Sequence, residues 1–114
     1  LEMGHNIGTH SHTHISVANL ELSKLEEELT KPKLILESEF NTNIMSMSYP
    51  FGESKDCLSA QSLIQKTNSY QLAFTIKNKL NTKNTSPLEI GRYMVHSSDN
   101  SKKLNKILKE SEIL

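Results

Sequence analysis

The residues best suited to chemistry are histidines crowded near the N-terminus. Four of the five fall within the first fourteen residues: His5, His10, His12 and His14. His10 and His14 stand four apart, a spacing that places two imidazoles on one face of a helical turn and lets both bind one tetrahedral zinc ion. If the segment is extended, His10, His12 and His14 share a face and form a three-histidine site. The alternatives are an exposed polar turn or a remnant of a purification tag, although Ser and Thr interrupt the histidines.

A zinc site of this kind needs a third ligand, usually histidine or a carboxylate, with water in the open position. Nearly all of the acidic residues are glutamates: eleven of the thirteen are Glu, and the only aspartates are Asp56 and Asp99. The glutamates at 26–28 fall within a helical pattern and are predicted to form a solvated face. Cys57 is predicted to be a small core residue instead of a nucleophile. The histidines therefore supply only part of a metal site.

Composition sets wider bounds on the class of protein. Thirteen Lys and Arg balance thirteen Asp and Glu, so no surplus of charge points to nucleic acid or to a membrane surface. The 114 residues suit one domain, and 35% hydrophobic content without Trp predicts a modest core. No apolar run approaches the roughly 20 residues of a membrane span. The first residues lack the basic start and apolar stretch of a secretory signal.

The hydrophobic pattern predicts that strands and helices alternate. Predicted strands cover residues 5–9, 44–47, 70–76 and 90–95, and predicted helices cover 19–30, 31–40, 56–68 and a terminal segment from a cap at 99–101. Leu22, Leu25 and Leu29 give the first helix its apolar face, and Leu36 and Phe40 are expected to face the core from the second. In the strand 70–76, Leu72, Phe74 and Ile76 alternate with polar residues, which is typical of a strand.

Two details fix the expected boundaries of these helices. Pro32 is accepted in a first helical turn, so Thr30 is predicted to end one helix and the proline to open the next. Ser54 or Asp56 is predicted to cap the third helix, and Asn68 to end it in a left-handed conformation. The alternation favours an α/β layer or part of a (β/α) barrel.

Chemistry in such folds sits at the carboxyl ends of the strands. The histidine-rich turn follows the first predicted strand, and the turn Tyr49-Pro50-Phe51-Gly52 follows the second. Both turns therefore occupy one edge of the predicted sheet, where they could face one pocket.

These segments resemble a known family. The sequence Ile-Gly-Thr-His-Ser-His-Thr-His at 7–14 resembles the second motif of polysaccharide deacetylases, the NodB-homology or carbohydrate esterase family 4 enzymes, whose pattern is His-Ser/Thr-x-x-His after a Gly-His-x-Ile-Gly strand. Residues 4–8 read Gly-His-Asn-Ile-Gly and match that lead-in. Residues 48–53 are similar to the Tyr-Pro-aromatic-Gly form of the third motif, residues 70–75 to the strand after it, and residues 92–95 to a late strand. The resemblance covers nearly the whole chain in the right order.

The resemblance implies that His10 and His14 bind a divalent metal, most often zinc, which would polarise an acetamide carbonyl and activate water to release acetate. It also implies that the backbone N–H near Phe51 lies in the oxyanion pocket and that Pro50 and Phe51 form the floor for a sugar ring. The candidate substrate and oxyanion residues are Tyr49, Pro50, Phe51 and Gly52. The structural alternatives are a simple turn, with Tyr49 and Phe51 as ordinary core aromatics.

His96 is a candidate general acid. Met94-Val95-His96 fits a hydrophobic-x-His motif that in many members supplies the protonated imidazole for the leaving amine. Members with Tyr-Pro-Phe-Gly often lack that motif, and the alternative for His96 is a loop that caps the last helix.

The sequence departs from the family pattern at its first motif. An Asp-Asp pair that supplies the catalytic base and the third metal ligand has no counterpart, because Asp56 follows the third motif and Asp99 lies near the C-terminus. Ser48 stands where many members carry the arginine that orients this base. Residues 1–114 are therefore interpreted as a single truncated polysaccharide deacetylase domain, a partial (β/α) barrel of about four strands and three to four helices.

Two functions remain open. The first is a metal-dependent hydrolase that cleaves the amide bond of N-acetylated sugars in a polysaccharide or oligosaccharide, inactive as this piece. The second is a noncatalytic remnant that binds saccharide or metal, or serves as an interaction module. A half barrel leaves sheet edges uncovered, which predicts self-association or pairing with the missing N-terminal segment. The resemblance suggests a cell-envelope or extracellular location for the full-length protein.

Overall fold

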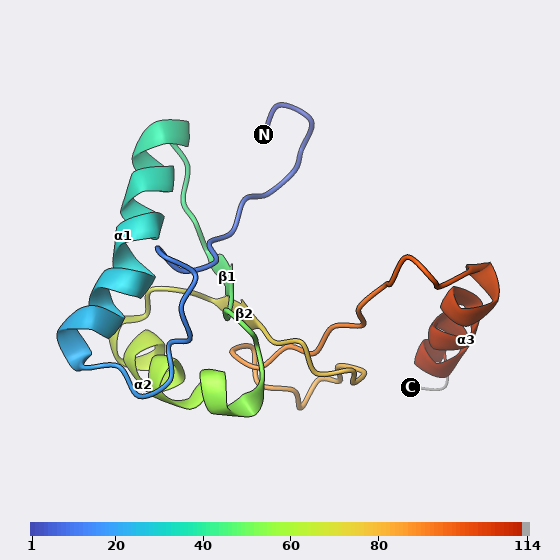
Figure 1. Ribbon diagram of the computed structural model, residues 1–114. Coiled ribbons are helices and arrows are strands. Elements are labelled where there is room, and N and C mark those ends of the chain that lie inside the picture. Colours follow the sequence, from blue (N-terminus) through green and yellow to red (C-terminus); the bar gives the residue numbers. More distant parts are fainter. Residues whose placement is uncertain (113–114) are drawn as a thin grey trace.

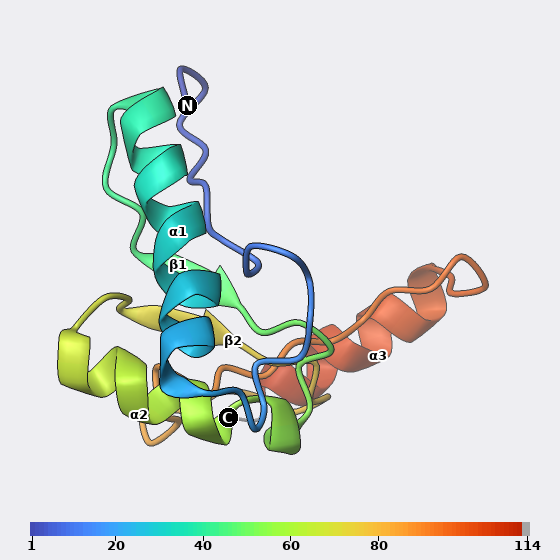
Figure 2. The same ribbon diagram turned by 60° about the vertical axis from the view of Figure 1, so that its left-hand side comes forward.

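Two parallel strands and two helices form the body of the protein in the computed structural model, which describes residues 1–112 (Figure 1). The elements in chain order are α1 (Leu22–Phe40), β1 (Ser46–Ser48), the 3-10 turn η1 (Ser54–Asp56), α2 (Leu58–Thr67), β2 (Leu72–Phe74) and α3 (Ser101–Glu112). Figure 2 shows α2 crossing under one end of the long helix α1, against which it packs. The predicted α/β class is confirmed.

The sheet is parallel, and its order follows the chain. Met47 of β1 pairs with Ala73 of β2, and single parallel bridges join Thr9 to Met47 and Phe74 to Ile90. The predicted strands at 5–9 and 90–95 are thus reduced to one bridge each. The first has a single strongly apolar residue to bury. The last stops after Ile90 because the Thr75 carbonyl accepts the Arg92 side-chain Nε at 2.8 Å, and the Arg92 N–H, which would continue the ladder, donates to the Lys77 carbonyl at 3.0 Å.

Helix α1 is continuous, so the predicted break at Thr30 is wrong. Pro32 lies inside the helix, where it lacks the N–H that would bond the carbonyl four residues earlier. Packing outweighs that lost bond, because Leu29 on one side of the proline is buried and Leu36 on the other packs against the core. The helix ends at Asn41, which is left-handed with φ 48°. Helix α2 ends in the same way at Asn68, as predicted.

The core lies between the two helices and one face of the sheet. It is built from Leu25 and Leu29 of α1, Ala60, Leu63 and Ile64 of α2, Met47 and Ala73 of the strands, and Val17, Ile44, Tyr49, Cys57, Tyr70 and Leu88 around them. Burial raises the pKa of the Cys57 thiol to about 11, which keeps it protonated near neutral pH. Its assignment as a core residue is confirmed.

Several apolar residues face away from this core. In and beyond β2, Ala73 and Thr75 are buried, whereas Leu72 and Ile76 are 40% and 37% exposed. Alternation specifies which residues share a face but not which face the helices cover. Here α1 and α2 cover the face of Met47 and Ala73. Leu22 and Phe40, near the two ends of α1, are likewise exposed, contrary to expectation.

Tyr70 ties α1 to the start of the histidine segment. Its hydroxyl donates to the Leu29 carbonyl at 2.6 Å and accepts from the Thr9 hydroxyl at 3.0 Å. Thr9 is in turn bonded into the sheet through the Ser46 carbonyl and the Ser48 N–H, both at 3.0 Å. The residue that precedes His10 is therefore held from two sides.

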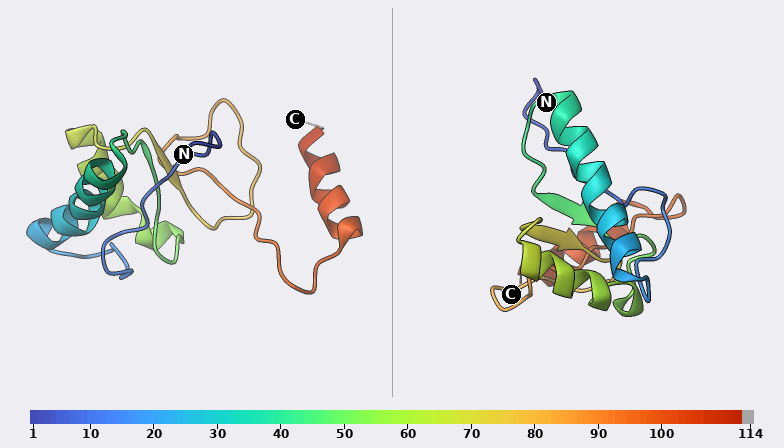
Figure 3. Two further views of the ribbon diagram at one scale, coloured as in Figure 1. Left: turned by 90° about the horizontal axis from the view of Figure 1, so that it is seen from above. Right: turned by 90° about the vertical axis from the view of Figure 1, so that its left-hand side faces the viewer.

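Helix α3 stands apart from the other elements (Figures 1 and 3). Within residues 1–112 it packs against no other helix or strand. The helix itself was predicted, and Leu104 and Leu108 on it are exposed. Of the helices in the described residues, none has the length and hydropathy to cross a membrane.

Replacement of Gly52 by Ala is expected to destabilise the fold. Gly52 has φ +67°, and a Cβ there would lie 2.9 Å from the backbone nitrogen and Cγ2 of Ile76. We expect Gly52→Ala to lower the free energy of unfolding by about 1–3 kcal/mol in urea denaturation. Gly4→Ala is the matched control, because Gly4 also has a positive φ but a Cβ there would meet no atom within 4 Å. Equal losses in both variants would contradict the role of the close contact.

Candidate functional site

His10 and His14 lie side by side in a loop that is neither helical nor extended. We call residues 10–14 the histidine loop; it lies beside α1 (Figure 2). Ser11 and His14 are left-handed, with φ 62° and 58°, and the Ser11 hydroxyl accepts the His14 N–H at 3.0 Å. The imidazole centroids of His10 and His14 are 4.8 Å apart, with the ring planes inclined at 62°. Loop conformation, and not helical spacing, brings the pair together.

The His10 ring is oriented by Ser48 at the end of β1. Its Nδ1 lies 2.9 Å from the Ser48 carbonyl oxygen and 2.8 Å from the Ser48 hydroxyl. Because a carbonyl can only accept, this contact fits the tautomer in which Nδ1 carries the proton and Nε2 has the lone pair. Histidine ligands of metals are commonly held in this way, by a hydrogen bond from the nitrogen that does not bind the ion.

Glu28 is the important residue that sequence reasoning missed. It was predicted on a solvated face, yet its side chain is fully buried. One carboxylate oxygen accepts the N–H groups of His12 and Thr13, each at 2.9 Å, and the other accepts the Thr13 hydroxyl at 2.6 Å. Burial alone would raise the carboxyl pKa, but these bonds and Lys24, 3.4 Å away, lower it to about 2.

A signal for this burial was present in the sequence. Glu28 stands three residues after Leu25 and directly before Leu29, which places it on the apolar stripe of α1. The run of three glutamates obscured that position, because its first two members, Glu26 and Glu27, are indeed exposed.

Asp56 is a second buried carboxylate and is also occupied. It accepts hydrogen bonds from the Ser16 hydroxyl and, at 3.1 Å, from the N–H of Glu53. Glu53 is the N-cap of η1 and Cys57 is the N-cap of α2, so the predicted cap of this helix at Ser54 or Asp56 is wrong. Asp56 thereby joins the segment after the histidine loop to the turn after β1.

The turn at 49–52 divides into a buried and an exposed part. Tyr49 is fully buried and donates to the Leu88 carbonyl at 2.8 Å, and burial raises its pKa. Pro50 is buried beside it. Phe51 is 56% exposed, with its ring centroid 5.3 Å from that of His14. Within residues 1–112 its backbone N–H donates to no acceptor.

The family model for polysaccharide deacetylase matches residues 1–73, which include the histidine loop, the turn at 49–52 and both strands up to Ala73. The chain belongs to the polysaccharide deacetylase family. Among curated proteins, none matches the sequence.

The fold of the chain is similar to that of solved deacetylase structures. A Streptococcus pyogenes deacetylase, PplD, solved in complex with acetate, superposes with a TM-score of 0.74 at 18% identity over 86% of this chain and 42% of its own. BC0361, a polysaccharide deacetylase from Bacillus cereus, superposes with a TM-score of 0.72 at 22% identity over 90% of this chain and 32% of its own. The chain thus spans less than half the length of either structure, in agreement with the predicted partial barrel.

His96 lies outside the histidine loop, in the segment before α3. Its backbone N–H donates to the Asp99 carboxylate at 2.7 Å, and Asp99 also pairs with Lys103 at 2.9 Å, so both residues belong to the segment that leads into α3. Figure 1 shows the segment at 93–100 leading away from the strands. Within residues 1–112, no group of three or more His, Cys, Asp or Glu side chains is placed to hold a metal ion. The alternative of three histidines on one extended face is therefore not formed.

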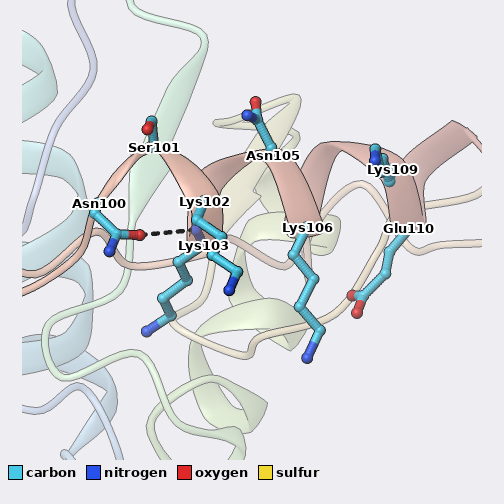
Figure 4. Close-up of a pocket in the computed structure, with 8 residues that line it drawn as sticks. All are labelled: Asn100, Ser101, Lys102, Lys103, Asn105, Lys106, Lys109 and Glu110. Atoms are coloured by element: carbon cyan, nitrogen blue, oxygen red, sulfur yellow. Dashed lines mark hydrogen bonds between the residues drawn. The ribbon is translucent and has the colours of Figure 1, made fainter.

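A hollow of about 890 Å³ borders α3 (Figure 4). It is lined by Asn100, Ser101, Lys102, Lys103, Asn105, Lys106, Lys109 and Glu110. None of these residues belongs to the histidine loop or to the turn at 49–52, so the hollow is separate from the candidate deacetylase site.

The stability that Glu28 provides is expected to depend on pH. Its pKa falls from 4.5 to about 2 on folding, so the stabilisation is fully present above about pH 4.5 and is lost as the pH falls toward 2. We expect Glu28→Gln to lower the free energy of unfolding by about 2 kcal/mol at pH 7, with a smaller loss at pH 3.

Glu27→Gln is the matched control, because Glu27 makes only exposed ion pairs with Lys24 and Lys31. Denaturant unfolding at both pH values measures the effect. A loss in Glu28→Gln that is the same at pH 7 and pH 3 would contradict an ionised, bonded carboxylate.

Proposed function

We propose that the protein is a metal-dependent deacetylase that hydrolyses the amide of N-acetylated sugars in a polysaccharide, and that this chain supplies the histidine part of its site. The observation that carries the proposal is the pair of His10 and His14. Their ring centroids lie 4.8 Å apart, and His10 is oriented by Ser48. Membership of the deacetylase family supports it. The acetate in the Streptococcus pyogenes structure is the product that such a reaction releases.

A divalent ion, with zinc the first choice, fits the chemistry of these two residues. The bonds to Ser48 leave His10 Nε2 as an acceptor, and zinc takes neutral imidazole nitrogens as ligands. His10 and His14 would hold the ion. When bound, it supplies Lewis-acid polarisation of the acetamide carbonyl.

The exposed part of the turn suits the substrate. The Phe51 N–H has no acceptor within residues 1–112 and can donate to the acyl oxygen as that oxygen gains negative charge. The Phe51 ring, beside His14, offers an apolar face to a sugar ring. Tyr49 anchors this turn to the core through the Leu88 carbonyl, Pro50 is buried beside it, and the Gly52 carbonyl accepts the Ile76 N–H at 3.0 Å.

The general base is proposed to lie outside this chain. Asp56 is bonded to Ser16 and to the Glu53 N–H, and Asp99 is bonded to the His96 N–H and the Lys103 side chain, so both aspartates are engaged away from the histidine pair. An aspartate pair from another segment of the protein would complete the site. His96 stays a prediction for the general acid. For the whole protein we propose action at the cell envelope or outside the cell, where such polymers occur.

A second candidate function is a noncatalytic module that pairs with another segment or with a second copy. The observation that favours it is the sheet face opposite the helices, where Leu72 and Ile76 are exposed. The bridges at Thr9 and Ile90 also leave short strand edges. The same surface fits pairing with the rest of a deacetylase barrel, so activity separates the two candidates.

Zinc titration tests the histidine pair. We expect the 114-residue chain to bind one zinc ion, with affinity at least about tenfold lower in His10→Ala and in His14→Ala, by isothermal titration calorimetry. His12→Ala is the matched control, because the bond from His12 to Glu28 uses the backbone N–H and not the ring. Full affinity in both ligand variants would overturn the proposed metal site.

An acetate-release assay tests the missing base. With zinc and N-acetylglucosamine oligomers, the 114-residue chain is expected to release no acetate above a blank without protein, because within residues 1–112 no carboxylate completes a metal group with the histidine pair. A form of the protein that carries the aspartate pair is expected to turn over. Turnover by the 114-residue chain itself would place the base within it, and inactivity of the longer form would favour the noncatalytic module.

A further inference from the structure

We propose that Glu28 is a positioning residue: its buried carboxylate holds the histidine loop in the conformation that lets His10 and His14 bind one divalent ion. The inference rests on the proposed metal site and goes beyond it, because Glu28 bonds to neither imidazole. It acts from α1, fourteen positions beyond the second histidine, through backbone groups of the loop and the Thr13 hydroxyl.

The bonds to Glu28 hold the middle of the loop. The three donors are the His12 N–H, the Thr13 N–H and the Thr13 hydroxyl, all from residues between the two proposed ligands. The Ser11 hydroxyl holds the end of the loop through the His14 N–H. A loop with two left-handed non-glycine residues is not favoured by local preference. Tertiary bonds must therefore stabilise it, and Glu28 provides three of them.

The pattern of donors requires a carboxylate. An ionised carboxylate only accepts, and its two oxygens can take all three hydrogen bonds. A glutamine of nearly the same shape offers one oxygen, and its NH₂ would face a donor. Lys24, 3.4 Å from the carboxylate, balances the buried charge. Glu28→Gln therefore changes the bonding of the loop with little change in volume.

The two histidines should respond differently to this change. His10 is held independently, through its ring, by the carbonyl and hydroxyl of Ser48. The position of His14 depends instead on the backbone of the loop, with the Phe51 ring beside it. Loss of the Glu28 bonds should therefore displace His14 more than His10.

The experiment compares Glu28→Gln with Glu27→Gln, the exposed neighbour, in the 114-residue chain. Isothermal titration with zinc measures affinity, and NMR without metal follows the amides of the loop and the two imidazoles. We expect Glu28→Gln to weaken zinc about 10- to 100-fold. It should also shift the His12, Thr13 and His14 amides and the His14 ring, with little change at His10 or at Ala73 in the sheet. Glu27→Gln should match the unchanged chain in both measurements.

A second pair of variants keeps the inference testable if Glu28→Gln does not fold. Thr13→Val removes the hydroxyl donor and keeps the shape, whereas Thr13→Ser keeps the donor. We expect Thr13→Val to weaken zinc severalfold and Thr13→Ser to restore the affinity. Equal affinities in the two variants would overturn the inference.

The outcomes separate the inference from the proposed function. A folded Glu28→Gln chain with undiminished zinc affinity and unshifted loop amides overturns the positioning role and leaves the metal site intact. If the unchanged chain binds no zinc, the metal proposal fails and the inference as stated fails with it. Loop shifts in metal-free Glu28→Gln would then assign Glu28 a purely structural role.

Discussion

The conformation of the histidine loop depends on one buried negative charge. Burying a carboxylate is costly unless hydrogen bonds compensate it, and Glu28 receives three from residues 12–13 with Lys24 beside it. Leu25 and Leu29, on either side of Glu28, pack α1 against the core. The position of the loop and the packing of the helix are therefore coupled, because neither can shift without uncovering the charge.

The remaining contacts join the other parts of the site to this unit. Tyr70 connects Thr9 to the carbonyl of Leu29, and the end of β1 orients His10 through Ser48. Asp56 links Ser16 to the turn that presents Phe51. Both buried carboxylates thus serve to assemble loops. Asp56 is therefore engaged in loop contacts, and Asp99 is bonded to the His96 N–H and to Lys103 before α3.

Sequence reasoning succeeded where the pattern was local or carried by a motif. The histidine pair and the Tyr-Pro-Phe-Gly turn pointed to the family, and strand-helix alternation predicted the α/β class and the parallel order. Sequence reasoning failed where packing between distant segments determines the structure. The break predicted at Pro32 is absent because core contacts on both sides outweigh one lost hydrogen bond. Alternation in the strand 70–76 did not indicate that Ala73 and Thr75 are buried, because it does not say which face the helices cover.

By itself, the sequence determined the family, the order of the elements and the two histidines four residues apart. Only the tertiary structure decided that these histidines meet through left-handed loop residues, that His10 is oriented by Ser48, and that Glu28 is inside. The physical reason is the range of the interactions. Helical spacing and motif identity are set within a few residues, whereas the burial of a carboxylate depends on donors fifteen or sixteen positions away in the chain.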